Sequence, residues 1–179
     1  RWACLMRTSS DLIIEFFEDA GVEHIFTVSG GGSIFLCDAL ARAKRMRYVC
    51  CHHEQAAGYA AECYARLRGI GVCLVTSGPG GTNAVSAVAS CWLDGVPVVF
   101  ISGQAFLAQT IRGHPGLRKM GVQEINIVDI VRPITKYAVM CESADMIKRE
   151  LDDAIRHATT PRFGPVWLDV PGCVQMAKM

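Results

Sequence analysis

The sequence predicts a single α/β domain, in which a doubly wound parallel sheet of about six strands has helices on both faces. Strand-like and helix-like patterns alternate along the chain, which is typical of a parallel sheet wrapped by helices. Several strand-like runs are apolar throughout, as in strands that are covered on both faces. The 179 residues contain no repeat and no low-complexity linker, so we expect one domain over residues 1–179.

The first half of the chain is expected to supply two strands and three helices. A polar start at Thr8 and a glycine stop at Gly21 bound a run with helical apolar spacing, which predicts the first helix. The next elements are expected to be a strand, a glycine turn, a helix, a second strand and a helix rich in small residues, at 24–28, 30–32, 34–40, 48–51 and 54–68. Gly69 is expected to end the last of these helices.

The second half is expected to complete the sheet. The glycine-rich loop 77–81 follows a continuous apolar strand and leads into a helix that ends near Leu93. After Gly103, a polar segment predicts an excursion over the surface. The elements expected in this half are strands at 72–76, 96–101, 137–139 and 166–170, and a helix at 143–157.

The composition argues against several classes of function. Eighteen basic and seventeen acidic residues leave a formal charge of +1 without a basic stripe, which argues against a nucleic-acid or membrane-surface role. No apolar run reaches the roughly 20 residues that span a bilayer, and the N-terminus lacks the order of a secretory signal peptide. We therefore expect a cytoplasmic protein.

The nine cysteines are scattered through apolar segments and contain no C-x-x-C pair. An odd, scattered set argues against a disulfide framework and a zinc site, and favours a reducing compartment. Cys50 and Cys51 precede two histidines, a pattern that is also compatible with metal binding. We expect instead that both thiols lie in a buried strand as small apolar groups.

Two glycine clusters, at 30–32 and 78–81, stand at strand-to-helix turns, where doubly wound folds bind ligands. Neither cluster is a nucleotide fingerprint, because G-x-G-x-x-G fails at Phe35 in the first and at Asn83 in the second. No Gly-Lys-Ser/Thr follows either cluster, which excludes a P-loop. Each cluster could equally be a tight turn with close backbone packing.

Glu54 stands at the junction between an expected strand and an expected helix. A carboxylate at this place can accept backbone N–H bonds at the helix start, where the helix dipole favours it. Alternatively, it can lie in an apolar pocket and share a proton with a ligand. The residue types alone leave both interpretations open.

Several segments resemble, in order, the N-terminal pyrimidine-binding domain of thiamine-diphosphate enzymes of the acetolactate synthase type. The clearest are HEQAAGYAAECYAR at 53–66 and TSGPGGTNA at 76–84. The other matching segments are PVVFISGQ at 97–104, VQE at 122–124, PITKYA at 133–138 and GPVWLDVP at 164–171. The match covers some 150 residues in register, and implies the fold expected above.

The resemblance implies roles for individual residues. Glu54 would activate the cofactor by sharing a proton with the N1′ nitrogen of its aminopyrimidine ring. Pro79 and Asn83 would bind near this ring, and the Gly30-Gly31 turn would line the mouth of the pocket. Gln104 would be a second catalytic residue, at the edge of the active site.

The resemblance also implies a reaction, the carboligation or decarboxylation of pyruvate or a related 2-oxo acid. The turn that shapes the substrate cavity reads Tyr-Pro-Gly-Gly-Ala in the synthases and Val-Ser-Gly-Gly-Gly at 28–32 in this chain, so the individual acid stays open. One alternative is a pyrimidine-domain subunit of a two-chain 2-oxo acid decarboxylase. Another is a non-catalytic assembly domain.

In this family a second domain, with a Gly-Asp-Gly motif and a downstream Asn pair, holds the diphosphate and Mg²⁺. A central domain carries FAD in true acetolactate synthases. Neither Gly-Asp-Gly nor Asn-Asn occurs in this chain. We therefore expect a chain that is incomplete as a catalyst by itself and has no metal site of its own. We also expect it to form a homodimer or a larger assembly, with the cofactor clamped against the diphosphate-binding domain of a partner subunit.

Overall fold

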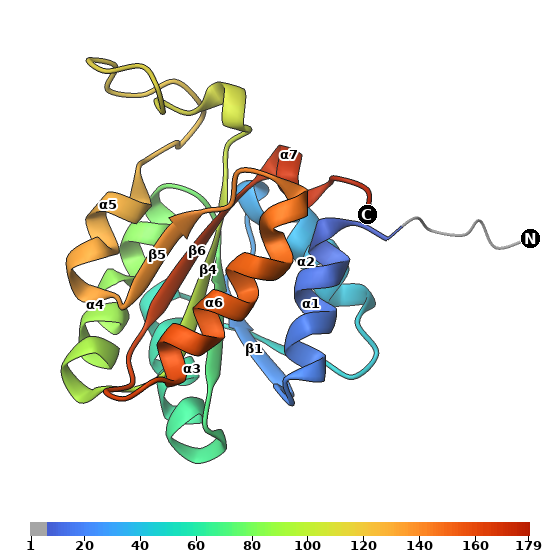
Figure 1. The fold of residues 1–179 in the computed structure, drawn as a ribbon, viewed down its shortest axis with the longest axis vertical. Coiled ribbons are helices and arrows are strands. Elements are labelled where there is room, and N and C mark those ends of the chain that lie inside the picture. Colours follow the sequence, from blue (N-terminus) through green and yellow to red (C-terminus); the bar gives the residue numbers. More distant parts are fainter. Residues whose placement is uncertain (1–6) are drawn as a thin grey trace, which may run out of the picture.

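A computed structural model describes residues 7–179 and confirms the expected fold class. Six parallel strands form one sheet in the order β2-β1-β3-β4-β6-β5 (Figure 1). Along the chain the strands are β1 (His24–Thr27), β2 (Arg47–Cys50), β3 (Gly71–Val75), β4 (Val98–Gln104), β5 (Tyr137–Met140) and β6 (Val166–Pro171).

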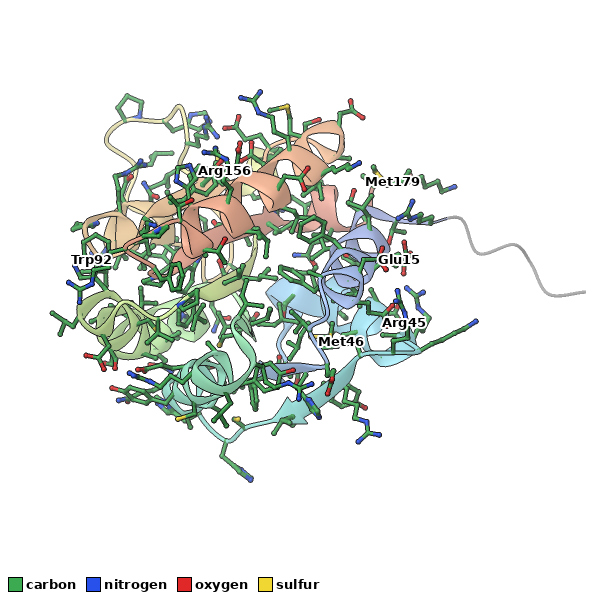
Figure 2. The ribbon with its side chains drawn as sticks, turned by 60° about the horizontal axis from the view of Figure 1, so that its bottom comes forward. Glu15, Arg45, Met46, Trp92, Arg156 and Met179 are labelled. Atoms are coloured by element: carbon green, nitrogen blue, oxygen red, sulfur yellow. The ribbon has the colours of Figure 1, made fainter. Side chains whose placement is uncertain are left out.

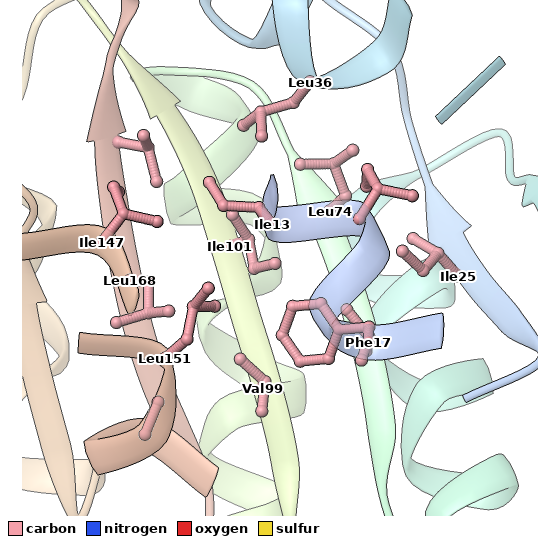
Figure 3. Close-up of a cluster of buried hydrophobic side chains, with 14 of the residues drawn as sticks. Ile13, Phe17, Ile25, Leu36, Leu74, Val99, Ile101, Ile147, Leu151 and Leu168 are labelled. Atoms are coloured by element: carbon pink, nitrogen blue, oxygen red, sulfur yellow. The ribbon is translucent and has the colours of Figure 1, made fainter. Parts of the chain in front are cut away.

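Helices cover both faces of the sheet, which gives a three-layer domain with two cores. The helices are α1 (Ser9–Asp19), α2 (Ile34–Arg42), α3 (Glu54–Arg68), α4 (Pro79–Asp94), α5 (Ile127–Val131), α6 (Ile147–Thr159) and α7 (Gly172–Gln175). Side chains of α1, α2 and α6 pack on one face, where Phe17 and Leu151 meet Ile101 of β4 (Figure 3). Side chains of α3, α4 and α5 pack on the other face around Phe100 and Trp167. The alternation of neighbouring strand residues between two buried layers explains why the runs are apolar throughout.

The strand order places a topological switch point between β1 and β3. From β1 the chain moves outward to β2 and then returns to the other side of β1 to form β3. Phe26 and Thr27 pair with Cys73 and Leu74 across this junction. In open α/β sheets the crevice at the carboxyl ends of such strands is the usual ligand site. The turns after β1 and β3 are the two glycine clusters, so both lie at this edge.

Two helix starts differ from the sequence expectation. Helix α4 begins at Pro79, so the loop expected over 77–81 is largely the first turn of a helix. Proline suits this position because the N–H it lacks would have no partner inside the helix. The helix expected from residue 143 begins as a 3-10 turn over Ala144–Met146 and becomes α6 only at Ile147.

Residues 105–126, here called the excursion, extend beyond the sheet as the sequence predicts (Figure 1). Residues 112–120 of this segment are all exposed. Charged side chains elsewhere are also exposed, among them Arg156 and Arg45, which points outward in Figure 2. None of the helices within residues 7–179 is both long and apolar enough to cross a membrane.

The expectation for Cys50 and Cys51 is wrong. Strand β2 lies at the edge of the sheet and all four of its residues are exposed, so the Cys50 thiol is accessible and Cys51 is only partly buried. A short apolar run has the same pattern on an edge strand as in a buried one, which is why the sequence misled here. Within residues 7–179 no three His, Cys, Asp or Glu side chains come together as a metal site.

Candidate cofactor site

Glu54 is the first residue of α3 and lies at the switch-point end of the sheet. His53 caps the helix, because its Nδ1 accepts a hydrogen bond from the Gln55 N–H at 3.1 Å. The only hydrogen bond that the Glu54 carboxylate accepts within residues 7–179 comes from a side chain, so it does not cap the helix through a backbone N–H. Its side chain is only 9% exposed. A carboxylate at a helix N-terminus is stabilised by the helix dipole, even where little water reaches it.

The two oxygens of the Glu54 carboxylate have different surroundings. Asn83 Nδ2 donates a hydrogen bond to Oε2 at 2.9 Å, so the structure brings these two predicted residues together. Oε1 accepts no hydrogen bond from any described residue. A Cβ atom placed on Gly80 would lie 3.6 Å from Oε1, which shows that this oxygen faces the first turn of α4. A buried carboxylate with one fixed and one free oxygen can exchange a proton with a ligand.

Thr76 packs between the two glycine turns and was missed by the sequence analysis as a residue in its own right. A Cβ atom on Gly30 would lie 2.5 Å from Thr76 Cβ, and one on Gly80 would lie 2.6 Å from Thr76 Cγ2. Thr76 Oγ1 also accepts a hydrogen bond from Gly32 N–H at 3.0 Å. Only glycine allows such close approach at 30 and 80. Gly31, by contrast, is exposed, and a Cβ atom placed on it would have no neighbour within 4 Å, so this residue is open to solvent.

The excursion returns directly over the N-terminus of α4. A Cβ atom on Gly78 would lie 2.3 Å from the carbonyl oxygen of Gln123. Both residues have positive φ, +59° for Gly78 and +54° for Gln123, and such a value is uncommon for a residue other than glycine. Pro79, the next residue, is exposed at this end of the helix. Pro79, Asn83 and the Gly30-Gly31 turn lie at the carboxyl ends of β1 and β3 or on the helix that follows β3, and their contact with the cofactor stays a prediction.

The structure places Gln104 in the interior, whereas the resemblance implies the edge of the active site. Its side chain is 2% exposed and its amide is engaged on both ends. Nε2 donates to Asp169 Oδ2 at 3.0 Å and to the Ile125 carbonyl at 2.9 Å, and Oε1 accepts from Ala105 N–H at 2.9 Å. A catalytic role for Gln104 stays a prediction, but these contacts leave its amide little capacity for a ligand.

Asp169 is a fully buried acid that the sequence analysis did not single out. Burial raises the pKa of Asp169 to about 7, although hydrogen bonds from Ser102 and Gln104 act in the opposite direction. Ser102 Oγ donates to Asp169 Oδ1 at 2.6 Å and accepts from Trp167 Nε1 at 2.8 Å. The available signal was an aspartate inside the otherwise apolar strand VWLDV at 166–170.

Comparison with known proteins identifies the family. Residues 7–130 match the family described as thiamine pyrophosphate enzyme, N-terminal TPP binding domain. The chain is 41% identical over 170 residues to "Acetolactate synthase 3, chloroplastic" of Brassica napus, which covers 94% of this chain and 25% of that protein. It is 39% identical over 165 residues to "Acetolactate synthase" of Mycobacterium bovis, covering 92% and 26%. The chain thus spans about a quarter of the length of these relatives. It belongs to the thiamine pyrophosphate enzyme family, as an N-terminal TPP-binding domain of the acetolactate synthase-like type.

Proposed function

We propose that this chain holds the aminopyrimidine ring of thiamine diphosphate and that Glu54 is the carboxylate that activates the cofactor. The observation that carries the proposal is the asymmetry of the Glu54 carboxylate. Asn83 fixes one oxygen at 2.9 Å, while the other faces Gly80 and accepts no hydrogen bond from residues 7–179. A carboxylate oxygen without a protein partner can accept a hydrogen bond from a ligand or share a proton with it.

Oε1 can accept a hydrogen bond from the edge of a planar ring, which supports an aminopyrimidine as the ligand. Gly80 presents backbone rather than a side chain to Oε1 of the carboxylate. Thr76 packs against both the turn at Gly30 and the start of α4, so the arrangement of these two segments is fixed before a ligand binds.

Thiamine diphosphate supplies, when bound, an acidic ring carbon that can add to the carbonyl of a 2-oxo acid. When the cofactor is bound, Glu54 would share a proton between its Oε1 and a nitrogen of the aminopyrimidine ring. Asn83 keeps Oε2 occupied, so that the proton is exchanged through one oxygen in one geometry. The low exposure of the side chain limits competition from water. Acid–base help of this kind is worth about 10²–10⁴ in rate.

The same proposal extends to the reaction and the assembly. We infer a carboligation or decarboxylation of pyruvate or a related 2-oxo acid, supported by the likeness to proteins named acetolactate synthase. We also propose that a diphosphate-binding domain of a partner subunit holds the diphosphate and Mg²⁺, since neither Gly-Asp-Gly nor Asn-Asn occurs in this sequence. A homodimer, and FAD in the intact enzyme, complete the proposed assembly.

The test is Glu54→Gln in the complete enzyme that carries this domain. Glutamine keeps the size of the side chain and can still accept from Asn83, but it cannot share a proton. Turnover is expected to fall by at least about 10²-fold, because proton sharing is lost. Glu62→Gln is the matched control: Glu62 lies on the same helix, is 5% exposed and pairs with Arg66 rather than facing the crevice. Normal turnover in Glu54→Gln, with correct folding shown by thermal unfolding, contradicts the proposal.

A further inference from the structure

We propose that Gln104 and Asp169 form a buried strut that positions the return limb of the excursion, residues 121–126, over the N-terminal turn of α4. Gln104 is on this view a positioning residue and not a catalytic one. The inference rests on the proposed function for its consequence, because this turn of α4 carries the residues that face Glu54. The contacts of the strut lie within the chain and do not involve the cofactor.

The strut joins three parts of the chain that are distant in sequence. Asp169 on β6 accepts from Gln104 Nε2 at 3.0 Å, and the same nitrogen donates to the carbonyl of Ile125 in the return limb at 2.9 Å. Ala105 N–H donates to Gln104 Oε1, which fixes the orientation of the amide. Each of these amide atoms is satisfied, and a fully satisfied buried network holds a single geometry.

A second carboxylate ties the rest of the excursion to the return limb. Glu124 is 6% exposed and accepts the N–H of Ile111 at 3.2 Å on one oxygen and the N–H of Met120 at 3.3 Å on the other. Glu124 thereby holds both Ile111, before the exposed residues 112–120, and Met120, at their end. Because Glu124 directly precedes Ile125, the strut anchors the whole excursion at this point.

The return limb lies in close contact with the start of α4. The Gln123 carbonyl occupies the space that a side chain on Gly78 would need, and a Cβ atom on Gly81 would lie 3.1 Å from Ile127 Cγ1. Gln123 has a φ of +54°, a conformation that persists only where the surroundings hold it. Gly80, between these two contacts, is the residue that faces Glu54. A shift of the limb therefore changes the turn against which the cofactor is expected to bind.

The test compares Gln104→Met with Ser10→Ala in limited digestion of the purified protein by trypsin. Methionine keeps the volume of glutamine and adapts to the core, but it breaks the strut. Arg112, Arg118 and Lys119 are exposed sites in the excursion. Cleavage at these sites is expected to become about tenfold faster in Gln104→Met, because local opening costs less free energy. Ser10→Ala removes a buried hydrogen bond from α1 to the Gln175 carbonyl and is expected to leave this rate unchanged.

Two further measurements separate failure of the strut from failure of the proposed function. In the unmodified protein, the Ala105 amide is expected to exchange slowly with deuterium, and fast exchange there contradicts the strut even if no variant folds. In the complete enzyme, Gln104→Met is expected to raise the thiamine diphosphate concentration that gives half-maximal activity more than it lowers the maximal rate. Faster cleavage with unchanged cofactor affinity refutes the positioning role. Unchanged cleavage refutes the strut, whatever the activity of Glu54 variants.

Discussion

Asp169→Asn is expected to remove a pH-dependent loss of stability that the native protein has between about pH 4 and pH 7. Asp169 is fully buried, and burial raises its pKa from the ordinary value of 3.8 to about 7. Asparagine has nearly the same shape and can still accept a hydrogen bond from Gln104, but it does not titrate. The variant therefore isolates the charge from the packing.

The sign follows from where the proton is bound. Between the two pKa values, the folded state keeps the proton on Asp169 while the unfolded state has released it, so raising the pH favours unfolding. A difference of about three pKa units at about 1.4 kcal/mol each corresponds to about 4 kcal/mol, reached in full above about pH 7. Below about pH 4 the residue is protonated in both states, and this contribution disappears.

Urea unfolding of the native protein and of Asp169→Asn, at several pH values from about 4 to 8, measures the effect. Taking the difference in unfolding free energy between the two proteins cancels the titration of other groups. The stability of the native protein relative to the variant is expected to fall by about 4 kcal/mol as the pH rises across this range. A difference that stays constant within about 0.5 kcal/mol refutes the reasoning.

Three other predictions concern close packing, thiol accessibility and a helix cap. Gly103→Ala is expected to lower the free energy of unfolding by at least about 3 kcal/mol, because its Cβ atom would lie 2.1 Å from the carbonyl oxygen of Gly32. Gly31→Ala, at a position with no neighbour within 4 Å, is expected to change the free energy of unfolding little. Equal effects of the two variants in urea unfolding contradict this prediction. Iodoacetamide is expected to label the exposed Cys50 in the folded protein but not the buried Cys73, because burial raises the pKa of the Cys73 thiol. Equal labelling of the two cysteines, measured by mass spectrometry, contradicts this burial pattern. Thr8→Ala is expected to lower the free energy of unfolding by about 1 kcal/mol, because it breaks the capping box of α1. An unchanged midpoint of urea unfolding in this variant contradicts that contribution.

The fold could be predicted from the sequence because its signals are local and repeated. Apolar runs such as 72–76 appear wherever a strand is buried on both faces, and Gly69 does end α3, with a φ of +94°. Strand β2 shows the limit of such signals. Whether a four-residue strand is central or at an edge depends on which strands pair with it, and this is a property of the whole topology.

The sequence indicated which residues to consider for the candidate site, but it did not indicate the contacts between them. Glu54 and Asn83 are 29 positions apart, and their hydrogen bond depends on how α3 and α4 pack together. The resemblance placed Gln104 at the edge of a site, whereas its partner Asp169 is 65 positions away and draws its amide into the interior. Pairings over such separations are fixed by tertiary structure, so no local pattern in the sequence could have shown them.

The most direct test of the central claim measures activation of the cofactor without any substrate. In the complete enzyme, the acidic ring proton of bound thiamine diphosphate can be followed by NMR as it exchanges with deuterium in the solvent. Glu54→Gln is expected to slow this exchange by at least about 10²-fold, while Glu62→Gln leaves it near the native rate. Exchange in Glu54→Gln at the native rate, with the cofactor shown to be bound, contradicts the assignment of Glu54 as the group that activates it.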